Sequence, residues 1–347
     1  MLGNYPIDRI SPNEHAAFQQ WIRGGNDWFS TTNSSKVSES IGQYSFNGNL
    51  VGSEIPQTDE PNEDCVGLVC RDGDIWQAGA FCTFHTGKFA VLSVRIEVGR
   101  DQAAIEIIEA MVHLARTRQV ELLQFILNEE ETDDTATTAR VRSCLGQAGL
   151  KPLTQLWRMN LDFMIVGLKK SVALVELSDK TSNFGEVVFR SAARDELAML
   201  STLTEKTYRG TLDCSELDGV RSTEETLIGY RDASQSQQRD WWIASIGTDD
   251  VGCVFLSEIG FDVWELTYMG VFPEFRGRGV GSALLQHAIS ECSAKHAQHL
   301  TLAVDERNAP AIELYRRHGF TVLGSIQAWY WHPGLQEKSL PISRLKK

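Results

Sequence analysis

The chain has 347 residues, of which 42% are hydrophobic and 23% are charged, and its formal net charge at pH 7 is −13. This length predicts two domains of ordinary size, and the composition is that of a globular protein with enough apolar residues for a sizeable core. The excess of negative charge argues against a nucleic-acid partner, and the lack of any run of 18 apolar residues argues against a membrane partner.

The first half of the chain predicts three strands followed by a helix, a strand, a second helix and a final strand. Residues 1–60 are rich in Asn, Ser, Gly and Gln, and only 14–23 has a helical pattern. Hydrophobic periodicity then predicts strands at 66–70, 76–84 and 89–94, a helix at 103–116, a strand at 122–127, a helix at 140–147 and a strand at 153–161. An Asp72-Gly73 turn joins the first two strands, an acidic loop occupies 129–134, and Gly149 follows the second helix.

The second half repeats this order of elements. The expected elements are a strand at 187–189, a helix at 194–207, strands at 241–246, 252–258 and 264–271, a helix at 279–295, a strand at 300–304, a helix at 309–318 and closing strands at 320–330. Gly319 caps the last helix as Gly149 caps its counterpart. The repeat is one of order and not of residue identity, and it predicts a duplicated domain with bounds 1–165 and 187–347, joined by a linker at 166–186.

Cysteine and histidine spacing gives no sign of a metal site or of a disulfide framework. The seven cysteines are scattered without a C-x-x-C pair, and the eight histidines lack H-x-x-x-H or H-x-E spacing. The N-terminus lacks the basic start and apolar stretch of a secretory signal. We therefore expect a cytoplasmic protein without a metal; the sequence does not indicate its oligomeric state.

The most informative stretch is the glycine-rich segment 271–281, which follows a strand and opens a helix. Glycines allow close approach of the backbone, and the first turn of a helix offers unpaired N–H groups and partial positive charge, so the segment can form a pyrophosphate cradle. Three other interpretations exist for such a segment. It can be a plain turn; a dinucleotide fingerprint places its first Gly directly after the strand, whereas residues 273–276 intervene here; and a nucleotide-triphosphate P-loop requires Gly-Lys-Ser/Thr, which is missing.

With these residues the sequence resembles the GNAT superfamily of acyl-CoA-dependent N-acyltransferases. The signature R/Q-x-x-G-x-G/A is present as Arg276, Gly279 and Gly281, behind a V-x-P arrangement at Val271 and Pro273. A second motif, N-x-x-A-x-x-x-Y-x-x-x-G-F, is matched by Asn308, Ala311, Tyr315, Gly319 and Phe320. The close resemblance covers about residues 187–332, while the first half matches only in its order of elements.

The resemblance implies an α/β (α+β) fold with two GNAT-like domains, each a mixed, mostly antiparallel twisted sheet flanked by helices. It implies acyl transfer, in the simplest case of acetyl from acetyl-CoA to a primary amine by direct attack in a ternary complex, with a small-molecule or peptide amine as acceptor. The alternative is a non-catalytic acyl-CoA-binding regulatory protein.

The resemblance also implies the coenzyme site. Backbone amides from Arg278 to Ser282 would hold the pyrophosphate, and the strand end at 269–271 would pair with the pantetheine arm. Asn308 would lie near the coenzyme, although it is equally well suited to be a helix N-cap. The expected coenzyme-binding residues are Met269, Gly270, Val271, Arg276, Gly277, Arg278, Gly279, Val280, Gly281, Ser282 and Asn308.

Catalytic roles are implied for two residues. Tyr315 would donate a proton to the leaving thiolate, and its alternative is a core tyrosine. Glu265 would accept the amine proton; strand alternation places it on the face shared by Thr267 and Met269, and its alternative is an ion-paired carboxylate. Tyr208, Asp213 and Glu216, in the loop after the first C-terminal helix, are candidates to orient the amine, against an ordinary polar loop.

The first half departs from the motif. Its strand-to-helix junction reads Val98-Gly99-Arg100-Asp101, which lacks the glycine spacing and places negative charge where a pyrophosphate would lie. Leu145 stands where Tyr315 stands in the second half. We therefore expect a degenerate, non-catalytic N-terminal copy, an arrangement that tandem members of the superfamily show.

Overall fold

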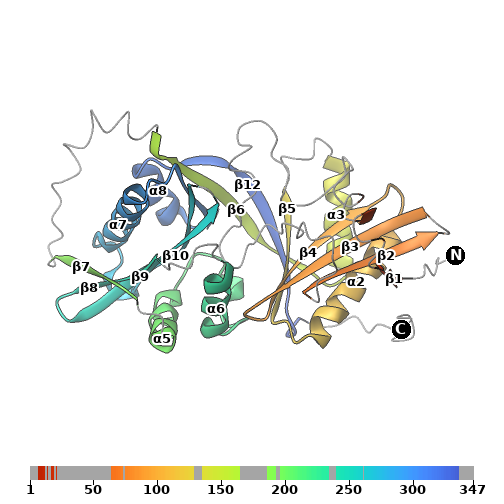
Figure 1. The fold of residues 1–347 in the computed structure, drawn as a ribbon, viewed down its shortest axis with the longest axis horizontal. Helices are drawn as coiled ribbons and strands as arrows, with labels where there is room; N and C mark the ends of the chain where they lie inside the picture. The colour runs from red at the N-terminus through yellow and green to blue at the C-terminus, as the bar shows by residue number, and fades with distance from the viewer. Residues whose placement is uncertain are drawn as a thin grey trace. The chain divides into compact units, whose positions relative to one another are not determined.

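The computed structural model describes residues 7–11, 14, 17–18, 21, 64–72, 75–128, 135–164, 186–192, 196–233, 240–260 and 262–335 (Figure 1). These residues form two compact units. The first contains the described residues up to Gln155 and those from Ser325 onward, and the second contains Leu156 to Gly324. Among the described residues, no helix is both long and apolar enough to cross a membrane.

The first unit is a sheet covered on one face by two helices. Its strands are, in spatial order, β1 (Ile7–Arg9), β2 (Cys65–Asp72), β3 (Ile75–His85), β4 (Phe89–Ile96), β5 (Leu122–Asn128) and the later part of β12 (Thr321–Trp331). Only β4 and β5 pair in parallel. Helix α2 (Asp101–Thr117) packs on β2, β3 and β4, and α3 (Thr135–Gln147) packs beside α2. The apolar stripe of α2, spaced for a helix, is fully buried against the sheet.

The second unit is a sheet covered on both faces. Its strands follow the order β6 (Lys151–Asp162, from residue 156), β11 (His299–Asp305), β10 (Val263–Val271), β9 (Asp249–Gly260), β8 (Asp240–Ile246) and β7 (Val187–Ser191). Helices α5 (Leu197–Tyr208) and α6 (Thr223–Ala233) share one hydrophobic cluster with β8 and β9. Helices α7 (Val280–Ala294) and α8 (Ala309–Arg317) share another with β9, β10 and β11, on the opposite face (Figure 1).

The two units share the later part of their order of elements and exchange their last strands. The series β2-β3-β4-α2-β5-α3 corresponds to β8-β9-β10-α7-β11-α8, whereas α5 and α6 lie between β7 and β8 in the second unit. Strand β6 follows α3 in sequence, yet it pairs with β11 of the second unit, from Leu156–Asp305 to Asp162–His299. Strand β12 follows α8 and pairs with β5 of the first unit. The compact units therefore differ from the expected bounds 1–165 and 187–347 by one strand each.

The expected fold class, mixed and mostly antiparallel sheets flanked by helices, is confirmed. Helix α6 and the short 3-10 turn η2 (Ser215–Leu217) were not predicted from the sequence. The expected linker at 166–186, except for Glu186, and the acidic loop at 129–134 lie outside the described residues, as do most of the expected helix 14–23 and Gly73 of the expected turn.

Candidate active site

The glycine-rich turn has the backbone conformation that its glycines predict. After β10 and the turn η3 (Pro273–Phe275), Gly277 and Gly279 have φ angles of 71° and 89°, in the left-handed region. A β-carbon at either position would meet nothing within 4 Å, so glycine is favoured by the backbone angle and not by lack of space. Helix α7 begins at Val280, and its first-turn N–H groups have no carbonyl one turn earlier to bond. The turn can therefore present peptide N–H groups to an anion.

Arg276 connects this turn to the end of helix α5 through hydrogen bonds. Its Nε donates to the carbonyl of Val271 (3.1 Å), Nη1 to that of Gly210 (2.9 Å) and Nη2 to that of Thr207 (2.7 Å). Arg276 is among the expected coenzyme-binding residues. The structure directs its guanidinium to three carbonyl oxygens, two of them at the C-terminal end of α5, where a cation also complements the helix dipole.

Three other residues of the turn have distinct surroundings. The guanidinium of Arg278 lies over the ring of Phe275, with Cζ 5.9 Å from the ring centroid. Val280 is buried in the cluster between α7 and the sheet, so only its backbone can face a ligand. The Ser282 hydroxyl is 3.0 Å from Nε2 of His318.

The sheet opens between β10 and β11 beside this turn. Within the described part of the chain, the two strands pair only at Val263–His299, Trp264–Leu300 and Glu265–Thr301. Strand β10 then continues to Val271 and β11 to Asp305, and these continuations do not pair with each other in the described part of the chain. Among the described residues, peptide groups of β10 that lie beyond Glu265 thus have no β11 partner.

A β-bulge in β10 changes the face on which Met269 lies. The register with β9 shifts between Leu266, which pairs with Leu256, and Tyr268, which pairs with Phe255. Leu266 and Met269 both pack against the α7–α8 cluster, whereas Tyr268 packs against the α5–α6 cluster. The expectation that Glu265 and Met269 share a face was wrong, because the extra residue of the bulge interrupts the alternation.

Gly270 is explained by packing. A β-carbon at this position would lie 2.5 Å from Oγ1 and 2.6 Å from Cβ of Thr207 on α5. Helix α5 therefore approaches β10 as closely as it does only because position 270 has no side chain.

Tyr315 is a buried phenol on α8. It is 7% exposed and packs against Phe320, with ring centroids 5.7 Å apart. Burial raises its pKa, and the negative charge of Asp213 raises it further, so the phenol stays protonated at neutral pH. Asn308 caps the same helix: its Oδ1 accepts a hydrogen bond from the Ala311 amide (3.4 Å), as its N-cap interpretation predicted.

Three tyrosines and a carboxylate gather on the α5–α6 face of the opening. Glu265 is 2% exposed, and its charge raises the pKa of Tyr230, which is already raised by burial. Tyr208 is half-buried and packs edge-on against Tyr268, with ring centroids 5.7 Å apart. Sequence reasoning missed Tyr230 because it lies on α6, a helix without a clear hydrophobic periodicity.

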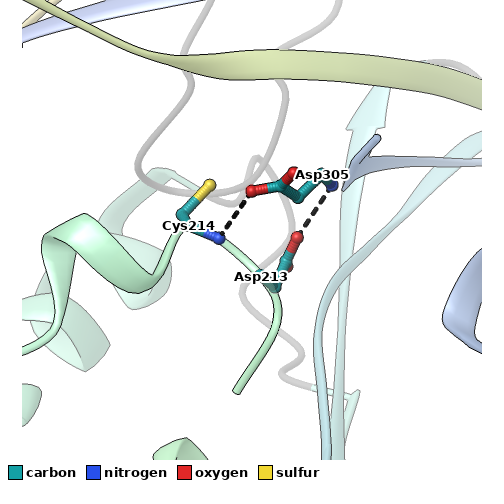
Figure 2. Close-up of side chains that lie close together, drawn as sticks. All are labelled: Asp213, Cys214 and Asp305. Carbon is teal, nitrogen blue, oxygen red and sulfur yellow. Dashed lines mark hydrogen bonds between the residues drawn. The ribbon is translucent and has the colours of Figure 1, made fainter. Parts of the chain in front are cut away.

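The loop after α5 is bound to the end of β11 by a reciprocal pair of hydrogen bonds (Figure 2). The Asp305 amide donates to Oδ1 of Asp213 (2.8 Å), and the Cys214 amide donates to Oδ2 of Asp305 (3.1 Å). Asp305 is completely buried. Asp213 is exposed as a residue, but its carboxyl end points toward Asp305, and burial of that end raises its pKa to about 6, to which the charge of Asp305 contributes.

Arg307 completes this connection. Its guanidinium contacts the Asp305 carboxylate, with Nε–Oδ1 at 2.9 Å, and binds both carboxylate oxygens of Glu216, at 2.6 and 2.9 Å. Glu216, expected to orient an amine, is therefore paired within the protein. Neither Asp305 nor Arg307 was predicted, because no local pattern indicates that they meet a loop about 90 residues earlier.

Two carboxylates and a thiol lie close together where this loop meets β11. Ligand atoms of Asp213, Cys214 and Asp305 lie within 4.8 Å of one another. However, Arg307 already neutralises Asp305, and the pKa of the Cys214 thiol is raised well above its usual value, mainly by burial.

The corresponding helix start in the first unit is occupied by the protein's own side chains. Asp101 lies in the first turn of α2, and Arg140 of α3 donates to its Oδ1 from Nε (3.0 Å) and Nη2 (2.7 Å). Arg140 also bonds the carbonyl of Glu97 (3.2 Å). Leu145, at the position that corresponds to Tyr315, is fully buried in the core. An anion at the start of α2 would therefore be repelled by the carboxylate of Asp101.

Comparison with known proteins identifies the class of this domain. Residues 204–320, all within the second unit, match the Acetyltransferase (GNAT) family. This part of the chain is therefore a GNAT-family domain, as its two motifs predicted.

The relatives match over short segments. A streptothricin acetyltransferase from Streptomyces lavendulae is 45% identical over 60 residues, which is 17% of this chain and 32% of that protein. A mycothiol acetyltransferase from Corynebacterium glutamicum (strain R) is 30% identical over 98 residues, 26% of this chain and 34% of that protein. The chain thus covers about a third of the length of each of these relatives.

A solved structure extends the likeness in fold. A GCN5-related N-acetyltransferase from Sphaerobacter thermophilus superposes with a TM-score of 0.50 at 17% identity, covering 80% of this chain and 83% of that one. At this identity the likeness concerns the fold alone.

Proposed function

We propose that the protein is an acyl-CoA-dependent N-acyltransferase that transfers acetyl from acetyl-CoA to a primary amine. The observation that carries the proposal is the arrangement around the opening between β10 and β11. The glycine turn follows the part of β10 that has no β11 partner among the described residues, and the buried phenol of Tyr315 belongs to the adjoining core. No side-chain nucleophile is required, since the amine attacks directly.

The residues present fit the coenzyme. Open space around Gly277 and Gly279 leaves room for a pyrophosphate at the start of α7, and the backbone from Met269 to Val271 offers peptide groups to the amides of the pantetheine arm. When bound, the coenzyme supplies an activated acyl thioester. The residues that would hold it are Met269, Gly270, Val271, Gly277, Arg278, Gly279, Val280, Gly281 and Ser282, with Arg276 positioning the turn and Asn308 at the start of α8.

Tyr315 is the proposed proton donor to the departing sulfur. A thiol has a pKa near 8.5, so a phenol with a raised pKa holds its proton until negative charge develops on the sulfur. A free alkylamine is mostly protonated at pH 7, and a carboxylate must take one proton from it before it attacks. Glu265 and Asp213 are the two carboxylates of the opening that can do so, and Tyr208 contributes to the wall on the acceptor side.

We further propose that the first unit binds no coenzyme. The pairing of Asp101 with Arg140 at the start of α2, and the apolar side chain of Leu145, support this proposal. The catalytic residues then all belong to the second unit.

The test is release of free thiol from acetyl-CoA with four acceptors: a peptide N-terminal amine, a lysine-containing peptide, a polyamine and an aminosugar. We expect turnover with at least one of them. Tyr315→Phe should lower kcat by about 10²–10⁴-fold and leave the KM for acetyl-CoA unchanged. Tyr330→Phe, which removes the hydroxyl of another buried tyrosine, is the matched control and should leave kcat unchanged.

Two results would contradict the proposal in different ways. Binding of coenzyme A by calorimetry without thiol release from any acceptor would support the regulatory acyl-CoA-binding alternative. Absence of binding by the folded protein would exclude both.

A further inference from the structure

Asp213 lies at the opening of the sheet. Its charge raises the pKa values of Tyr208 and Tyr230, on one face of the sheet, and of Tyr315, on the other. A group that acts on both faces is placed where the sheet is open. The hydrogen bond from the Asp305 amide gives the same position independently, because Asp305 ends β11 beyond the last pair with β10.

The Asp213 carboxylate is held in place by one oxygen and leaves the other available. Oδ1 accepts the hydrogen bond from Asp305, while Oδ2 has no hydrogen-bond partner among the described residues. The nearby cation, Arg307, binds the carboxylates of Asp305 and Glu216. Asp213 is exposed as a residue, and this second oxygen is the one that a cationic group would contact.

Glu265 is less suited to exchange protons with solvent. It is 2% exposed and stands at the last pair between β10 and β11, on the closed side of the opening. Asp213, in contrast, is exposed as a residue.

We propose that Asp213 binds the ammonium group of the acceptor and removes its proton, an inference that rests on the function proposed above. One proton passes from the ammonium group to Asp213, which later releases it to solvent. The nitrogen of the neutral amine then forms its bond to the acyl carbon while the carbon–sulfur bond breaks. Tyr315 gives its proton to the sulfur and regains one from the nitrogen, so that the products are an amide, a free thiol and one released proton.

The surroundings of Asp213 shift its pKa in the direction that suits a base. Burial of its carboxyl end and the charge of Asp305 raise its pKa to about 6, against the opposing effects of the Asp305 amide and the Arg307 charge. The ionisable groups that face it are Asp305, Arg307, Glu216, Cys214, Tyr208, Tyr230 and Tyr315. A base with a pKa near the working pH is both deprotonated and able to accept a proton.

The experiment compares Asp213→Asn and Asp213→Glu with wild type, using acetyl-CoA and an acceptor from the panel above. Asparagine keeps the Oδ1 acceptor for the Asp305 amide and loses only the charge. We expect Asp213→Asn to lower kcat/KM for the amine by about 10²–10⁴-fold at pH 7, with an unchanged KM for acetyl-CoA. The wild-type profile should fall below about pH 6, and the variant should lose this limb and regain rate at high pH, where the amine deprotonates by itself. Asp213→Glu should retain the acid limb.

Asp218→Asn is the matched control, because it removes the same charge from an exposed position five residues further along the loop. It should behave as wild type. If Asp213→Asn keeps the acid limb and stays within about threefold of wild type, and Glu265→Gln instead removes the limb, the inference is overturned while the proposed function stands. If wild-type protein is inert with all four amines, the proposed function is overturned, and the role of Asp213 with it.

Discussion

Thr207 on α5 lies directly over the α-carbon of Gly270 on β10, so that a single added methyl group at position 270 would come within 2.6 Å of the threonine Cβ. This contact fixes the distance between α5, which leads into the loop that contains Asp213, and β10, which borders the opening. The threonine hydroxyl is also hydrogen-bonded to the Tyr268 hydroxyl and to the carbonyl of Thr204, so it is not free to move aside.

Gly270→Ala should therefore destabilise the protein by about 1–3 kcal/mol, the range for overpacked cores. It should also raise the KM for the acceptor, because α5 must shift. Thermal unfolding and steady-state kinetics measure both effects. The control is Gly146→Ala in α3, where the new β-carbon has no neighbour closer than 3.9 Å; it should stabilise by about 0.5–1 kcal/mol. Equal unfolding midpoints for the two variants would show that the contact with Thr207 has no energetic effect.

Substitution of Arg276 tests whether its guanidinium stabilises the fold or binds a phosphate. Arg276→Ala removes three hydrogen bonds from a cation to carbonyl oxygens and should lower the free energy of unfolding by about 1–3 kcal/mol. Arg209→Ala removes the same charge from a neighbouring exposed position and should leave the unfolding midpoint nearly unchanged. If Arg276→Ala raised only the KM for acetyl-CoA and left the unfolding curve as in wild type, its guanidinium would be a phosphate ligand after all.

A carboxylate placed in the first turn of α7 should imitate the arrangement of α2. Ser282→Asp adds negative charge where the proposed pyrophosphate lies, and should weaken coenzyme A binding by about tenfold or more relative to Ser282→Ala. Helix α7 itself should not suffer, because acidic residues favour a helix N-terminus. Calorimetric titration of both variants checks this. Affinities within about twofold of each other would place the anion elsewhere.

The raised pKa of Asp213 predicts a stability effect opposite to its effect on activity. Its pKa is about 6 in the folded protein and 3.8 in an unfolded chain. The folded state therefore binds the proton more tightly than the unfolded state, and the charged carboxylate destabilises the folded state. The destabilisation by this carboxylate is therefore complete above pH 6, and it decreases as the pH falls toward 4. Asp213→Asn should unfold at a higher temperature than wild type at pH 8 and at nearly the same temperature at pH 4. A lower midpoint at pH 8 would mean that the charge stabilises the loop.

Much of the site could be predicted from local sequence. The left-handed angles of Gly277 and Gly279, the helix that starts at Val280 and the capping role of Asn308 are each set by residues close in the chain, and the structure has them where the sequence placed them. The order of strands and helices in each half also follows from hydrophobic periodicity.

Other features depend on partners far apart in sequence. The bulge near Thr267 is a property of the register between two strands, and nothing in β10 alone marks it. The pairing of Glu216 with Arg307 depends on where the loop after α5 meets the end of β11, which tertiary packing decides. For the same reason, local sequence does not predict the hydrogen bonds from Arg276 to the carbonyl oxygens of Thr207 and Gly210.

The exchange of final strands has a consequence for synthesis. The first unit receives the strand beside β5 only from residues 325–331, so while the chain is being made, β5 waits as an open edge until nearly 200 further residues have left the ribosome. The second unit, in contrast, begins with β6, so the partner of β11 is synthesised before the rest of that unit. A truncated chain that ends at α8 would therefore lack the strand that completes the sheet of the N-terminal unit.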